Sequence, residues 1–111
     1  MTAFGTIYYA RKFIETVGIE NPMISRCQDG LFRVFVDTGF RVSATRSTCA
    51  TINSRFGKCL RFRKDHKSGD YQILAPCDYL GEVREKLSRY KGEGSNRIWQ
   101  EKRNIKSQEN G

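Results

Sequence analysis

The stretch LFRVFVDTGFRVSAT, residues 31–45, alternates apolar and polar side chains on both sides of Asp37-Thr38-Gly39. This period of two residues is typical of a half-buried β-strand, and a short glycine-containing turn between two such runs predicts a β-hairpin. The face expected to pack on the core carries Phe32, Val34, Val36, Phe40, Val42 and Ala44. The face expected to be exposed carries Arg33, Phe35, Arg41, Ser43 and Thr45. The hairpin is therefore predicted to be structural on one side and available to a partner on the other.

Two more strands and a helix are predicted after the hairpin. The segment RFGKCLRFRK, residues 55–64, alternates apolar residues with arginine and indicates a third strand. YQILAP, residues 71–76, indicates a fourth strand, and DHKSGD, residues 65–70, has the composition of the turn between them. The helix is predicted from a stripe at helical spacing, formed by Leu80, Val83, Leu87 and Tyr90.

The first segment, FGTIYYARKFIETVG at residues 4–18, fits two patterns. Ile7, Ile14 and Val17 share a helical stripe that Gly18 would end, whereas Ile7, Tyr9 and Phe13 fit a strand. The helix is favoured, and a new element is expected near Met23 after the breaker ENP. The predicted class is α+β, a small antiparallel sheet of about four strands with a C-terminal helix and an N-terminal helix or strand. Residues 1–92 would form one compact domain, and residues 93–111 a polar tail, with a short helix there as the alternative.

Positive charge is concentrated in one part of the chain. The whole sequence has a net charge of +8. Residues 41–67 contain eight bases and one acid, a net charge of +7, whereas residues 1–40 are neutral and residues 68–111 carry +1. Such a block creates a local positive potential that attracts polyanions. The alternative is a solvated basic surface without a dedicated partner.

The cysteines and the single histidine do not form a recognisable metal or catalytic motif. Cys27, Cys49, Cys59 and Cys77 contain no Cys-x-x-Cys pair, the usual element of zinc ribbons and fingers. His66 lies in a charged turn, and the sequence has no glycine-rich phosphate-binding motif. We therefore expect reduced, buried thiols, no metal, no cofactor and no enzymatic activity, with a nuclease as a minor alternative.

The basic side chains of the predicted strands are spaced suitably for nucleic acid. Alternate side chains of a strand lie about 6.5 to 7 Å apart, near the spacing of successive phosphates. The loop STCATINSRFGK, residues 47–58, adds hydroxyl and amide groups that can donate to phosphate oxygens. Exposed rings of Phe35, Tyr71 or Trp99 would instead stack on unpaired bases. The predicted contact residues are Arg33, Arg41, Arg46, Arg55, Lys58, Arg61, Arg63, Lys64 and Lys67.

The order of these features resembles a known kind of DNA-contacting segment. A strand, then VDTGFRV at residues 36–42, then a basic loop of small polar residues with Gly57 is similar to short β-rich segments of small phage proteins and of regions beside phage homing endonucleases. The resemblance covers about residues 31–63, and the Asp-Pro-rich continuation of that family is absent after Gly57. It implies a phage origin and DNA contacts by Arg33, Arg41, Arg46, Arg55 and Lys58.

Two functions follow as hypotheses. The first is a small non-enzymatic nucleic-acid-binding protein, with DNA favoured over RNA, that uses the basic sheet face and loop. The alternative is a protein-binding inhibitor or adaptor, of the host-takeover or anti-defence type, that docks its basic face on an acidic host protein. No apolar run approaches the roughly 20 residues needed to span a bilayer, so no membrane partner is expected. The expected location is the cytoplasm, that of the host for a phage-encoded protein.

Overall fold

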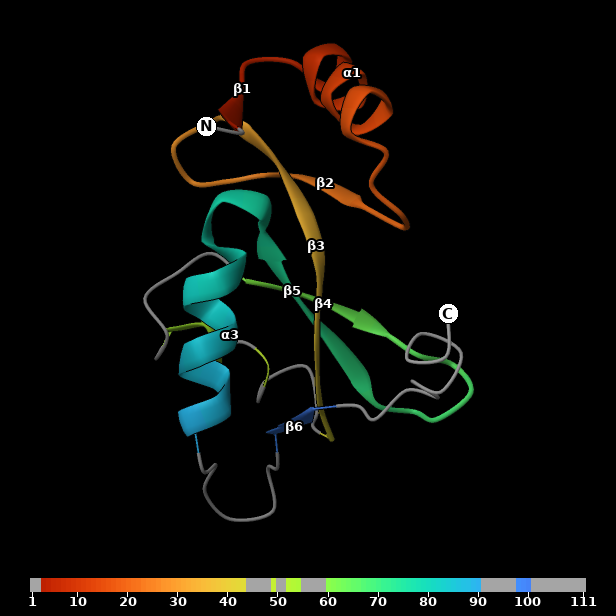
Figure 1. Cartoon of the computed structure of the whole chain (residues 1–111), viewed down its shortest axis with the longest axis vertical. Coiled ribbons are helices and arrows are strands. Elements are labelled where there is room, and N and C mark those ends of the chain that lie inside the picture. Colours follow the sequence, from red (N-terminus) through yellow and green to blue (C-terminus); the bar gives the residue numbers. More distant parts are fainter. Residues whose placement is uncertain (1–2, 44–48, 50–51, 55–59, 91–97, 101–111) are drawn as a thin grey trace, which may run out of the picture.

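A computed structural model of the protein describes residues 3–43, 49, 52–54, 60–90 and 98–100. The chain has an α+β fold with one antiparallel sheet (Figure 1). Its elements are β1 (Ala3–Phe4), α1 (Ile7–Val17), β2 (Met23–Arg26), β3 (Phe32–Val42), β4 (Arg61–Lys64), β5 (Tyr71–Pro76), the 3-10 helix η1 (Cys77–Tyr79), α3 (Leu80–Arg89) and β6 (Ile98–Gln100). The predicted class is confirmed, and the N-terminal segment supplies both a short strand and a helix.

The strand β3 is the centre of the sheet and runs along most of the molecule in Figure 1. The strand β2 pairs with its first half and β6 with its last residues. Both β1 and β5 lie along the other edge of β3. A residue of β3 that pairs with two strands has one on each edge: Arg33 pairs with β1 and β2, Phe35 with β2 and β5, and Arg41 with β5 and β6. The strand β4 pairs with β5 and extends the sheet beyond it.

The predicted hairpin over residues 31–45 is wrong, because β3 continues through Asp37-Thr38-Gly39 as one strand. Both halves of β3 pair with β5, and the register shifts between the pairs Asp37–Leu74 and Arg41–Gln72. Three residues of β3 therefore face one residue of β5, an enlarged form of a β-bulge. Gly39 takes the left-handed φ of 85° that this bulge needs. The Thr38 hydroxyl donates to the carbonyl of Ile73 at 2.7 Å and fixes the bulge to β5.

The predicted third and fourth strands do form a hairpin. The strands β4 and β5 are antiparallel, and the turn of residues 65–70 between them closes with a hydrogen bond from the Asp65 amide to the Asp70 carbonyl at 2.8 Å. The strand β5 has the predicted bounds. The strand β4 covers the end of the predicted run, since residues 55–59 lie outside the described residues.

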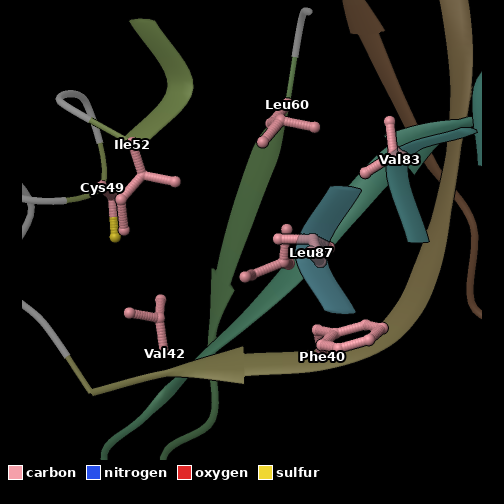
Figure 2. Close-up of a cluster of buried hydrophobic side chains, with 9 residues drawn as sticks. Phe40, Val42, Cys49, Ile52, Leu60, Val83 and Leu87 are labelled. Atoms are coloured by element: carbon pink, nitrogen blue, oxygen red, sulfur yellow. The ribbon is translucent and has the colours of Figure 1, made fainter. Parts of the chain in front are cut away.

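The main core lies between α3 and one face of the sheet (Figure 2). The helix α3 packs against β3, β5 and β6, and contributes Val83 and Leu87, both at most 1% exposed. The predicted helical stripe is therefore confirmed, with Leu80 and Tyr90 packed around the edge of the cluster. The remaining buried members are Phe40, Val42, Cys49, Ile52, Leu60, Ile73 and Ala75.

The opposite face of the sheet is covered at Phe35 and Arg41, contrary to the prediction, whereas Ser43 is exposed as predicted and Thr45 lies outside the described residues. Phe35 and Leu74 are fully buried there in a small cluster with Cys27 and Met23. Phe35 therefore cannot stack on a base. The alternation itself is confirmed for the core face at Val34, Phe40 and Val42, which are all at most 5% exposed.

The ends of the chain add a helix and a strand. Thr6 caps the start of α1 by accepting from the Tyr9 amide, and Gly18 ends it at a φ of 78°. The favoured helix is thus confirmed, and its Phe13 ring lies 5.5 Å from that of Phe4 in β1. In the predicted tail, residues 98–100 form β6, so a helix at this position is wrong. None of the helices in the described ranges is long and apolar enough to cross a membrane.

Candidate nucleic-acid interface

The turn between β2 and β3 holds a carboxylate against an arginine. The Cys27 amide donates to the Leu31 carbonyl at 2.8 Å, and Gly30 takes a left-handed φ of 84°. This turn lets Asp29 Oδ1 accept from the Leu31 amide at 3.0 Å. Both Asp29 oxygens also accept from the Arg33 guanidinium, at 3.0 and 2.8 Å. The side chain of Arg33 is consequently fixed in a two-pronged ion pair.

A groove of about 790 Å³ opens beside this turn. Three strands, β2, β3 and β4, each supply one arginine to it, namely Arg26, Arg33 and Arg61. Its other lining residues include Asp29, Asn53, Ser54 and Tyr79. We refer to the space lined by these seven residues as the arginine groove. It brings two of the predicted contact arginines, Arg33 and Arg61, together with Asn53 and Ser54 of the loop at residues 47–58.

A second groove, of about 490 Å³, adjoins the first. It is lined partly by Lys64, His66 and Tyr71, and it shares Asn53 and Arg61 with the arginine groove. The two grooves therefore have Asn53 and Arg61 as common lining residues, and basic side chains line both of them. His66 is exposed, as its position in a charged turn predicted.

Arg61 connects β4 to β2 across the covered face of the sheet. Its Nε donates to the Ser25 hydroxyl at 2.7 Å, and one Nη donates to the Arg26 carbonyl at 2.9 Å. The guanidinium carbon lies 5.1 Å from the centre of the Phe35 ring, in cation–π contact. Arg61 thus helps to bury Phe35, while its side chain still lines both grooves.

Arg63 makes a parallel connection on the same strand. Its Nε donates to Gln72 at 3.0 Å, and an Nη donates to the Asn21 carbonyl at 3.1 Å. Asn21 precedes β2, so Arg61 and Arg63 both join β4 to the β2 region. Both arginines therefore hydrogen-bond within the protein, whereas the alternation of the strand predicted that they face solvent.

Arg26 was absent from the predicted contact residues, although it is well placed in the arginine groove. It is exposed, and its guanidinium lies 5.1 Å from the centre of the Phe32 ring. Within the described ranges, no carboxylate or carbonyl hydrogen-bonds to this guanidinium. The charge pattern does not single out Arg26, because residues 1–40 are neutral overall. The signal that could have found it is the Asp29-Gly30 dipeptide, which marks a turn directly after Arg26.

The ion pair in the arginine groove is fully charged at neutral pH. The hydrogen bonds from Arg33, followed by that from the Leu31 amide, hold the pKa of Asp29 below its usual value. The hydrogen bond to Asp29, followed by one to Cys27, raises the pKa of Arg33. Since Asp29 neutralises Arg33, the positive potential of this groove comes mainly from Arg26 and Arg61.

Arg41 is not exposed as predicted, because only 8% of the residue is accessible. Its Nη1 donates to Asp65 Oδ2 at 3.1 Å, which joins β3 to the turn after β4. The Lys67 amide and then the nearby Arg41 charge lower the pKa of Asp65, which is partly exposed. The sheet buries Arg41 between β5 and β6, with Gln72 and Trp99 as its partner residues.

We expect Arg41→Ala to lower the free energy of unfolding by about 1–3 kcal/mol, because it removes one partner of a partly buried charged hydrogen bond. Urea denaturation measures this change. The control is Arg89→Ala, since Arg89 pairs with Glu85 on the surface of α3 and its side chain is 76% exposed. Exposed pairs of this spacing contribute only about 0.3–0.5 kcal/mol. Equal losses in the two variants would contradict a structural role for Arg41.

The remaining predicted contact residues are either exposed or outside the described residues. Lys64 and Lys67 are exposed, at the end of β4 and in the turn that follows it. Arg46, Arg55 and Lys58 lie outside the described residues, as do most residues of the polar loop. Of that loop, residues 49 and 52–54 are helical, and Asn53 accepts from the Leu60 amide at 2.8 Å.

Two of the four cysteines lie in the core as predicted, and Cys59 lies outside the described residues. Cys27 and Cys49 are buried, and Cys77 is half-buried. Burial raises the pKa of Cys49 and of Cys77, so neither is activated as a nucleophile. Within the part of the chain that the structure describes, no three metal-ligating side chains are grouped together.

Comparisons with known proteins do not extend this description. The chain matches no family model, no curated protein and no solved structure.

Proposed function

We propose that the protein binds nucleic acid without catalysing a reaction on it. The contacts would be made by the arginine groove, the second groove beside it and the loop of residues 47–58. Guanidinium groups bind phosphate through paired hydrogen bonds, and a chain of phosphates suits two adjoining basic grooves. The net charge of +7 over residues 41–67 would attract such a ligand to the protein. DNA is favoured over RNA on the resemblance of residues 31–63 to phage DNA-contacting segments.

The observation that carries this proposal is the environment of Arg26. Arg33 and Arg61 each have hydrogen-bond partners inside the protein. Arg26 instead rests on the Phe32 ring with an exposed side chain that lines the same groove. A guanidinium held by a ring loses little conformational freedom when it binds phosphate, so its position favours tight contact.

Arg26→Ala should weaken binding of duplex DNA, single-stranded DNA or RNA, whichever binds best, by about tenfold or more. Fluorescence anisotropy with labelled oligonucleotides at fixed salt measures this loss. The stability should fall by less than about 1 kcal/mol, because the side chain is exposed and loses mainly its contact with Phe32. The matched control is Arg84→Ala on α3, which is also exposed but lies outside both grooves. Equal effects of the two substitutions would refute a site at Arg26.

A protein-binding role is the second candidate, favoured by the surface of α1. Tyr8 and Tyr9 are each 60% exposed there, and Val17 is 56% exposed. Exposed aromatic residues beside bases such as Lys12 are typical of protein interfaces. Absence of binding to all three nucleic acids at moderate salt would favour this candidate, an inhibitor or adaptor that docks on an acidic protein.

We further propose a cytoplasmic location, in the host if the protein is encoded by a phage. Cys27 and Cys49 are buried and Cys77 is half-buried, and such sheltered thiols would suit a reducing compartment. Phage origin is supported only by the sequence resemblance.

A further inference from the structure

We infer that the arginine groove accepts one unpaired nucleotide, with its base against Tyr79 and its phosphate at Arg26. This inference rests on the proposed function and narrows the ligand to a single strand. The groove volume of about 790 Å³ lies in the range of pockets that hold small molecules. A nucleotide within a duplex could not enter it, because its base is paired and stacked.

The mixed charge of the groove favours a base over a second phosphate at one end. Asp29 lines the groove, and its side chain is 46% exposed. A carboxylate repels phosphate, but it accepts hydrogen bonds from the amino groups of bases. A carboxylate has about four acceptor positions, of which Leu31 and Arg33 occupy three. Asp29 can therefore accept from one amino group, such as that of cytosine or adenine.

Tyr79 gives the groove an aromatic surface. It belongs to η1, directly after the end of β5, and is 37% exposed. An exposed ring beside arginine and a carboxylate can stack on a base while the polar groups bind its edge and its phosphate. Phe35 cannot do this, and Tyr8 and Tyr9 lie on α1, outside the groove lining.

The test compares single-stranded oligo(dC), oligo(dT) and duplex DNA on the full chain. We expect the single strands to bind more tightly than the duplex, and oligo(dC) more tightly than oligo(dT), which has no amino group. Tyr79→Ala should weaken binding of the single strands by about 5- to 150-fold, the loss of one base stack. Tyr79→Phe keeps the ring and should bind like the wild type. Tyr9→Ala is the matched control and should also bind like the wild type.

The outcomes separate this inference from the proposed function. If Tyr79→Ala fails to fold, Tyr79→Leu replaces it, since leucine fills space without a ring to stack. Duplex binding that equals single-strand binding, with no loss in the Tyr79 variants, would overturn the nucleotide pocket and leave the proposed function intact. Binding of none of the nucleic acids, at low or moderate salt, would overturn both.

Discussion

Val34→Asp should abolish the folded state. Val34 is fully buried in β3, where it pairs with Ile24 of β2. A carboxylate at this position would lose its hydration, or would have to bind a proton, at a cost of several kcal/mol, roughly. Domains of this kind are usually stable by only about 5–15 kcal/mol, so the substitution removes most or all of the stability. Far-UV circular dichroism and thermal melting measure the loss of structure.

The control for this substitution is Val17→Asp at the end of α1. Val17 is 56% exposed, so a charge there remains hydrated. Its cost should stay within about 1 kcal/mol, mainly because a negative charge at a helix C-terminus is unfavourable. A cooperative melt of Val34→Asp at the wild-type temperature would mean that β3 does not face the core as described.

The residues Asp37-Thr38-Gly39 show that a local sequence pattern predicts which residues form strands better than it predicts which strands pair. The same three residues suit a hairpin turn and a bulge, because both need a glycine with a positive φ. The choice depends on the partner strand. Here β5 pairs with both halves of β3, and the Thr38 hydroxyl reaches the Ile73 carbonyl, which no local sequence pattern indicates.

The alternation of β3 and β4 predicted correctly which residues share a face, but not which faces are covered. Val34, Phe40 and Val42 lie in the core as the period of two indicates. Burial of the arginine-bearing face depends on contacts between distant segments, such as that of Arg61 with Ser25. Arginine on a strand does not by itself indicate a solvent-exposed face, because its long side chain can cover an aromatic ring while its charged end reaches polar partners.

The sequence predicted that the candidate interface carries positive charge, but it did not predict which residues come together there. The block of bases at residues 41–67 includes β4, which lines both grooves of the candidate interface through Arg61. Arg26 and Tyr79 join it only because β2 and η1 approach β4 in the folded chain. Neither residue belongs to a charged or aromatic pattern, so the roles proposed for them could not be predicted without the fold.

Raising salt from about 50 to 200 mM should weaken nucleic-acid binding by about two orders of magnitude or more. If five phosphates are neutralised, the logarithm of affinity falls with the logarithm of salt at a slope of about 4.5 on duplex DNA, or about 3.5 on a single strand. The affinity would therefore drop by about 500-fold or about 130-fold, respectively. A salt titration of binding measures the slope, because each neutralised phosphate releases its condensed counterions.

The double substitution Lys64→Gln and Lys67→Gln should lower this slope by about 1.8 on a duplex, or about 1.4 on a single strand. Both lysines are exposed, so the fold should survive their replacement. The matched control is Lys86→Gln with Arg89→Gln on α3, where Glu82 and Glu85 already pair with the two bases. The control should keep the slope of the wild type, because those charges are balanced locally. A lower slope in the control than in the Lys64 and Lys67 variant would place the phosphate contacts on α3, away from both grooves.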